Sequence, residues 1–214
     1  MSSTHAKLDH AHHFNSADHE FAAGKIGMWL FLVTEIMLFS GLFVGYGIFH
    51  YIYPEMFREA HHELNKVLGS INTIVLLSSS LTMALAINAI QRDKPELAKK
   101  MLAFTFLCAC TFLCIKFFEY SHKFHEGLLP GKFYSNTELK APNAALFFSF
   151  YFVMTGIHGI HVLIGMACIA WIYIRVNRGD FDSHHYNAVE FVGLYWHIVD
   201  LVWIFLFPLL YLVV

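Results

Sequence analysis

The chain has 214 residues, of which 57% are hydrophobic and 14% are charged, and its formal net charge is -2 when histidine is neutral. Soluble domains carry about 25% charged residues, so this composition predicts an integral membrane protein. The near-neutral charge gives no electrostatic basis for binding nucleic acid.

The first 25 residues are predicted to form a polar tail rich in histidine: His5, His10, His12, His13 and His19. The tail lacks the apolar run of a signal peptide. We interpret it as a solvated, pH-sensitive segment, with weak metal binding as the alternative.

Residues 26–214 are predicted to form a single membrane domain. A helix needs about 20 mostly apolar residues to cross a hydrocarbon core about 30 Å thick. The stretches that qualify are 26–50, 67–90, 101–120, 144–174 and 188–213. In lipid, each element must pair its own backbone polar groups, so we expect these spans to be helices. The predicted fold class is therefore all-α, an integral membrane bundle of five transmembrane helices.

Five spans place the two termini on opposite sides of the membrane. More lysine and arginine residues fall on the N-terminal side, among them Arg92, Lys94, Arg175 and Arg178, than on the other side. The positive-inside rule then predicts a cytoplasmic N-terminus and a C-terminus outside.

Ionisable residues inside membrane helices cost roughly 2.5–3.5 kcal/mol each at the helix centre, so none is expected to face lipid. In this chain they are Glu35, Lys116, Glu119, His158, His161, Glu190, His197 and Asp200. Each should face another helix or a partner subunit.

Glu35 follows the start of the first span by nine residues, which places it about 14 Å into the membrane at 1.5 Å per residue. Residue type and depth leave two readings open. Glu35 is either a proton or gas-access site, or an acid that packs by hydrogen bonding to a neighbouring helix. Gly41 and Gly45 follow it at a GxxxG spacing, which favours close approach of a second helix.

The later spans carry polar residues at helical spacing. His158 and His161 are three residues apart, a spacing that can ligate a metal, and His197 and Asp200 are also three apart and can hydrogen-bond. A di-metal carboxylate site needs Glu-x-x-His pairs on two helices, and the predicted spans contain none. We therefore predict no metal site and an intramembrane polar network made of Glu119, His158, His161, Glu190, His197 and Asp200.

Several motifs together resemble subunit III of the haem–copper oxidases. They are, in chain order, GMWLFLVTEIMLFSGLF, GSINTIVLLSSSLTM, FFEYSH, TGIHGIHVLIG and VEFVGLYWHIVDLVWIFLFPLLY. The resemblance covers nearly all of residues 25–214, and its last motif is the most specific. The longest family members have seven spans, so this chain resembles the short five-helix bacterial form. Near SHHYNAVEF the register departs by one residue, so His184 and His185 receive no role.

The resemblance implies a non-catalytic subunit of a bacterial proton-pumping cytochrome c oxidase in the cell inner membrane. Such a subunit carries no haem or copper, which lie in partner subunits. Its expected partners are subunit I as the main contact, subunit II, further respiratory subunits and bound phospholipids. Its expected roles are to support proton uptake, active-site durability and oxygen access.

The resemblance also assigns residues by register. Glu35 falls on the family's carboxylate and is expected to be functional, and Glu119 falls on an acidic position. Arg175 falls on an arginine that holds a lipid phosphate at the cytoplasmic surface, and an arginine at a helix end suits a phosphate bidentately.

Three alternatives differ from this interpretation. The chain could be the corresponding subunit of a quinol oxidase or an accessory subunit of a nitric oxide reductase, since these differ in the chemistry of the partner. A stand-alone proton-coupled transporter is a different class, and the lack of a convincing internal repeat weighs against it.

Overall fold

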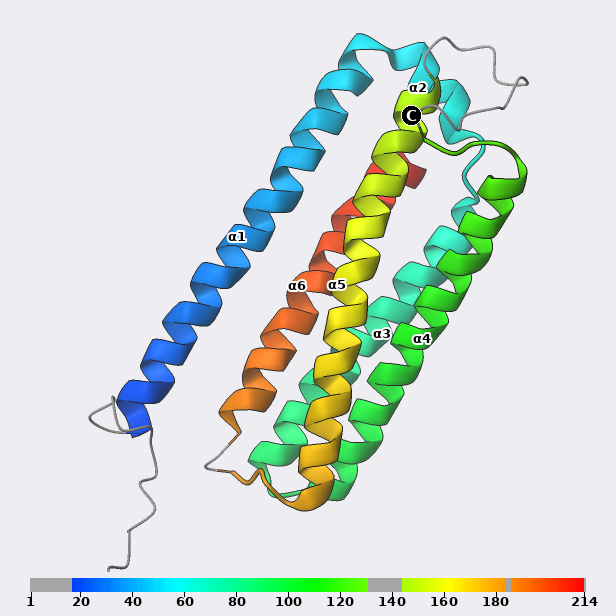
Figure 1. The fold of residues 1–214 in the computed structure, drawn as a ribbon. Helices are drawn as coiled ribbons and strands as arrows, with labels where there is room; N and C mark the ends of the chain where they lie inside the picture. Colours follow the sequence, from blue (N-terminus) through cyan, green and yellow to red (C-terminus); the bar gives the residue numbers. More distant parts are fainter. Residues whose placement is uncertain (1–16, 131–143, 184–185, 214) are drawn as a thin grey trace, which may run out of the picture. The chain divides into compact units, whose positions relative to one another are not determined.

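The computed structural model describes residues 17–130, 144–183 and 186–213. In this part of the chain it has six helices and no β-strand, which confirms the all-α prediction (Figure 1). The helices are α1 (Ala17–Ile52), α2 (Pro54–His61), α3 (Lys66–Gln91), α4 (Pro95–His125), α5 (Ala144–Arg178) and α6 (Asn187–Tyr211). Every helix except α2 is long and apolar enough to cross a membrane, as predicted.

The chain divides into two compact units within α1: Met1–Leu38 and Phe39–Val214. In the described part of the first unit, α1 begins at Ala17, inside the segment predicted to be a tail. Lys25 Nζ lies 4.4 Å from the centroid of the Phe21 ring, and the Thr34 hydroxyl donates to the Phe31 carbonyl at 2.6 Å. The local helix therefore starts before the apolar run that hydropathy detects.

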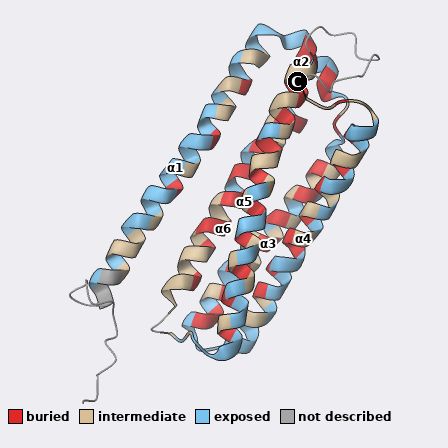
Figure 2. Ribbon diagram, in the orientation of Figure 1, coloured by how far each residue is buried: buried red, intermediate tan, exposed pale blue. Residues whose placement is uncertain are grey.

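The second unit contains the end of α1 and all of α2–α6. Within it, α3 contacts α4 and α6, and α5 also contacts α4 and α6, so these four helices form a closed ring. Buried positions run in stripes along the four helices, with exposed positions between them (Figure 2). The interior is filled by large side chains with less than 2% exposure, including Trp196, Trp203, Tyr151, Phe112 and Phe147.

Glycine decides how closely α6 approaches its neighbours. A Cβ at Gly165 of α5 would lie 2.7 Å from the Trp196 ring, so α5 and α6 need glycine at this crossing. The predicted GxxxG packing is only partly confirmed. A Cβ at Gly45 would lie 3.4 Å from the Phe150 ring, whereas a Cβ at Gly41 would meet nothing within 4 Å.

The short helix α2 was not predicted from the sequence, because eight residues with several charges fall below any test for a span. It has Pro54 at its start, which suits the first helical turn. Met56, Phe57, Ala60 and His61 are buried, and they pack α2 onto α5. The helix is therefore amphipathic, with Glu55 among its exposed residues.

Helix α4 is longer than the predicted span 101–120 and runs from Pro95 to His125. Glu96 lies in its first turn and basic residues lie in its last turn, an arrangement that stabilises the helix dipole. These polar ends belong to the helix but lie outside the apolar run from which the span was predicted.

Candidate functional site

Two charged residues of α4, Lys116 and Glu119, are buried inside the second unit, where they are 7% and 4% exposed. Lys116 Nζ lies 2.8 Å from Glu119 Oε2, and it also donates to the Tyr211 hydroxyl oxygen at 2.7 Å. The Tyr211 hydroxyl in turn donates to Glu119 Oε1 at 2.5 Å. The three side chains therefore form a closed hydrogen-bonded cluster that joins α4 to the end of α6.

Aromatic rings surround the ammonium of this cluster. Lys116 Nζ lies 4.7 Å from the centroid of the Trp203 ring, 5.1 Å from that of Tyr211 and 5.5 Å from that of Tyr151. Ring faces attract a cation, and a buried charge is tolerated only when it is paired and hydrogen-bonded. Lys116 lies outside the predicted network, although its spacing to Glu119 is helical. Tyr211 was missed because no local signal links it to α4.

A hollow of about 350 Å³ lies beside the cluster, between the α2–α3 connection and α4. Glu119 lines it, together with Glu63, His122 and Lys123. Lys123 is 2% exposed, and its Nζ lies 2.7 Å from Glu126 Oε2. The buried cluster therefore borders a hollow that ionisable side chains help to line.

Hydroxyl groups of α3 hold α6 along a second seam. Ser80 Oγ lies 2.8 Å from His197 Nδ1, and Trp196 Nε1 donates to Ser79 Oγ at 3.1 Å. Seven residues further along α6, Trp203 Nε1 donates to Thr73 Oγ1 at 3.1 Å. His197 of α6 therefore contacts α3 through Ser80, and the wider intramembrane network stays a prediction.

Asp200 does not form the hydrogen bond that its spacing from His197 allows. It is 3% exposed, and neither carboxyl oxygen has a hydrogen-bond partner among the described residues. It lies close to Ser79 and Ser80 without hydrogen-bond geometry. The predicted His197–Asp200 pair is therefore replaced by the His197–Ser80 contact.

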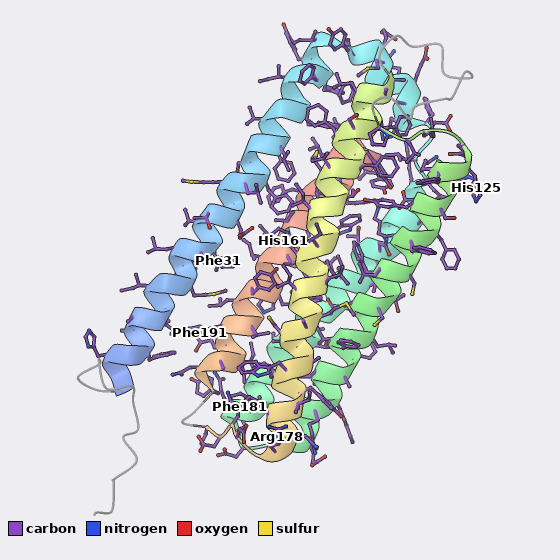
Figure 3. The ribbon with its side chains drawn as sticks, in the orientation of Figure 1. Phe31, His125, His161, Arg178, Phe181 and Phe191 are labelled. Atoms are coloured by element: carbon purple, nitrogen blue, oxygen red, sulfur yellow. The ribbon has the colours of Figure 1, made fainter. Side chains whose placement is uncertain are left out.

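The two histidines of α5 do not act as a pair. His158 is 1% exposed, and its ring centroid lies 5.3 Å from that of Trp203 and 5.5 Å from that of Phe112. His161 lies midway along α5 (Figure 3), and its Nδ1 bonds the Ile157 carbonyl at 2.8 Å. The His161 ring also packs 5.4 Å from Phe39. Each ring is thus packed against a different neighbour.

In residues 17–130, 144–183 and 186–213, no group of three or more His, Cys, Asp or Glu side chains could hold a metal ion. Helix α4 nevertheless contains a Glu-x-x-His spacing that the predicted spans lack. Because α4 continues to His125, Glu119 and His122 form a Glu-x-x-His spacing within a helix. The two side chains have different partners, since His122 Nε2 lies 2.9 Å from Glu126 Oε1.

The remaining predicted residues lie outside this cluster. Glu35 is half-buried in the first unit, and Glu190 is half-buried in the first turn of α6. Arg175 lies in the last turn of α5, where its Nε donates to Asp180 Oδ2 at 2.9 Å. Its guanidinium lies 5.1 Å from the Trp171 ring and 4.7 Å from the Phe181 ring, at the end of α5 where Figure 3 labels Phe181 and Arg178. Four of the tail histidines, His5, His10, His12 and His13, lie outside the described residues.

The end of α6 is capped by side chains of α1 and α2. The Tyr46 hydroxyl donates to the Leu209 carbonyl at 3.0 Å, and His61 Nδ1 donates to the Leu210 carbonyl at 3.0 Å. These carbonyls lie in the last turn, where a helix has no intrahelical donors left. Burial, followed by the nearby Lys66 charge, lowers the pKa of His61 below its usual value of 6.5.

The fold and these contacts define a multi-pass membrane protein in which some buried polar residues link helices. The family described as "Cytochrome c oxidase subunit III" matches residues 10–213. The "Cytochrome c oxidase subunit 3" of Synechocystis sp. is 35% identical over 187 residues, which cover 87% of this chain and 74% of that protein. The "Probable quinol oxidase subunit 3" of Staphylococcus epidermidis is 29% identical over 212 residues, or 95% of each chain. The corresponding Staphylococcus aureus protein is 29% identical over 201 residues, or 93% of each chain.

The chain therefore belongs to the subunit III family of haem–copper oxidases. It is a component of a multi-subunit oxidase that serves respiratory electron transport. The subunit III family carries no redox cofactor.

Proposed function

We propose that this chain is subunit III of a bacterial proton-pumping cytochrome c oxidase. The observation that favours cytochrome c as the electron donor is the 35% identity to the Synechocystis protein of that name. The alternative is subunit III of a quinol oxidase. The staphylococcal relatives of that name favour it, because their alignments cover a larger share of this chain. Both readings assign the same supporting role to the chain, because oxygen reduction takes place in a partner.

The proposed role is to pack on subunit I as the main contact, with subunit II and further respiratory subunits as additional partners. The haem and copper would lie in these partner subunits. The Lys116–Glu119–Tyr211 cluster and the Ser80–His197 contact support this role, because they join three helices of the ring. A bundle held in this way presents its outer apolar faces, including Leu107, Phe117 and Leu163, to lipid or to a partner. The proposed location is the inner membrane, with the N-terminus in the cytoplasm, because lysine and arginine are more frequent on that side.

Two residues are proposed to perform specific supporting functions. Glu35 would sustain proton uptake and oxygen access during turnover. Arg175 would hold a phospholipid phosphate. Only its Nε bonds a described residue, so the two Nη groups can bind phosphate.

The donor is tested by oxygen uptake of the purified complex. A cytochrome c oxidase consumes oxygen with reduced cytochrome c and not with a soluble quinol. The opposite preference would favour the quinol oxidase reading and overturn the assigned donor. A complex that reduces nitric oxide and consumes no oxygen with either donor would overturn both.

A further inference from the structure

The seam between α4 and α5 contains a hollow of about 260 Å³ that none of the predicted site residues lines. We call it the α4–α5 slot, and it is lined by Leu102, Ala103, Phe106, Ala170, Tyr173 and Ile174 among others. Each helix contributes an alanine to this lining, Ala103 from α4 and Ala170 from α5, and these side chains are small. Because Ala103, Phe106 and Ile174 are exposed, the slot opens sideways out of the bundle.

The slot lies between two helices that can each span a membrane. We therefore expect its opening to face the hydrocarbon of the lipid and not water. Apart from the Tyr173 phenol, its named side chains are aliphatic or aromatic hydrocarbon. Tyrosine is enriched where a membrane helix meets the head-group layer, and Tyr173 is 39% exposed. These features place the slot along the acyl region, with its Tyr173 end at the head-group level.

A lysine lies one turn beyond the Tyr173 end of the slot. Lys99 precedes Leu102 by three residues on α4, and Asn177 follows Ile174 by three residues on α5, so both lie one turn beyond the slot. Lys99 Nζ donates to Asn177 Oδ1 at 3.4 Å and lies 2.6 Å from Glu96 Oε1. The Lys99 side chain is 21% exposed, so its ammonium is held over this end rather than extended into water.

We propose that the α4–α5 slot binds one phospholipid of the leaflet on the N-terminal side, with an acyl chain in the slot and its phosphate on Lys99. An ammonium has three donors, and Asn177 and Glu96 occupy two of them, which leaves the third for a phosphate oxygen. A hollow lined by hydrocarbon side chains, with an ammonium one turn beyond its end, is complementary to a hydrocarbon chain that carries a phosphate.

This site is separate from the one proposed at Arg175. The Arg175 guanidinium stacks on Trp171 and Phe181, and Arg175 does not line the slot. The inference also holds for either electron donor, because it needs only that α4 and α5 span the membrane. If the slot binds no phospholipid, the proposed function of the chain is therefore unaffected.

The test is photo-crosslinking of the whole oxidase complex, reconstituted in membranes with a phosphatidylglycerol that carries a diazirine on its acyl chain. Wild-type protein should be labelled on peptides covering 102–106 and 169–174. Ala103→Phe and Ala170→Phe should abolish this labelling by filling the slot. Ala84→Phe, at an exposed alanine of α3, should retain it.

The phosphate contact is tested separately, so that a filling variant that fails to assemble does not decide the result. Lys99→Ala should reduce slot labelling about tenfold, the effect expected for a lost hydrogen bond between charged groups. Lys100→Ala, at the neighbouring exposed lysine, should not reduce it. Equal labelling in wild-type and Lys99→Ala complexes would overturn the proposal, as would the absence of lipid label because another protein chain occupies the slot.

Discussion

The ammonium of Lys116 donates a hydrogen bond of 2.7 Å to the hydroxyl oxygen of Tyr211, and this contact joins α4 to the last turn of α6. The same hydroxyl donates to Glu119, so a single phenol completes the pairing of a buried ammonium and a buried carboxylate. Charges buried in a membrane helix require partners, and here they receive them from a helix that lies far along the chain.

Lys116→Met should destabilise the protein by about 3–5 kcal/mol, because it leaves the Glu119 carboxyl buried without its cation. The measurement is the midpoint of thermal unfolding of the purified complex. Lys116→Met combined with Glu119→Gln should recover much of the loss, since the second change removes the unpaired charge.

The exposed pair Arg58–Glu55 provides the control for this prediction. Its atoms are 3.8 Å apart, and the two side chains are 61% and 80% exposed. Arg58→Met should change stability by about 1 kcal/mol or less. A Lys116→Met midpoint as high as that of Arg58→Met would show that the cluster does not stabilise the bundle.

Gly165→Ala should lower stability by about 1–3 kcal/mol, because a Cβ 2.7 Å from the Trp196 ring forces the two helices apart. Gly41→Ala should be neutral or stabilising by up to about 1 kcal/mol, since it meets nothing within 4 Å and alanine favours the helix. Thermal unfolding of both variants separates the two cases. Equal losses would mean that close packing at Trp196 is not what requires Gly165.

The lowered pKa of His61 should make the stability of the contact between α2 and the end of α6 depend on pH. Its pKa is lowered in the folded state by burial and then by Lys66, and the exposed His62 adds a smaller effect. The unfolded state then binds the proton more readily than the folded state. The stability that neutral His61 contributes is therefore complete above about pH 6.5 and is lost as the pH falls below it.

The measurement is the unfolding midpoint at about pH 7.5 and about pH 5.5, values on either side of the histidine range. Wild-type protein should lose more stability on acidification than His61→Gln, which cannot titrate. His62→Gln is the control at the exposed neighbour and should behave like wild type. An acid sensitivity that His61→Gln leaves unchanged would exclude His61 as its source.

Glu35→Gln tests the proposed role of the carboxylate in α1. The variant should assemble, because glutamine keeps the shape and hydrogen-bonding capacity of the side chain, but it should inactivate sooner during turnover or pump fewer protons per electron. Glu55→Gln on the exposed face of α2 is the matched control. If Glu35→Gln equals wild type in both assays, Glu35 is a packing residue.

The helical bundle could be predicted because each span is a continuous apolar run that hydropathy detects without tertiary information. The helix ends could not be predicted in this way. Ala17, Pro95 and His125 are polar-flanked ends that extend beyond the apolar runs. Helix α2 was missed for the same reason, since its stability comes from packing Met56 and Phe57 rather than from its length.

Some of the polar contacts could be predicted from local spacing in the sequence, and others could not. The Lys116–Glu119 pair is local, and its spacing could have identified it. The partners Tyr211 and Ser80 lie far along the chain from Lys116 and His197, so only the packing of helices brings them together. Asp200 shows the limit of spacing arguments, because two residues three apart on a helix need not bond when a third group is better placed.

The most direct test of the account is affinity purification through a tag on this chain from its native membrane, in mild detergent, followed by an optical spectrum and identification of the subunits. If the chain is subunit III of an oxidase, a haem-containing complex that includes a catalytic oxidase subunit should be recovered. Recovery of the chain as a haem-free homo-oligomer would contradict it.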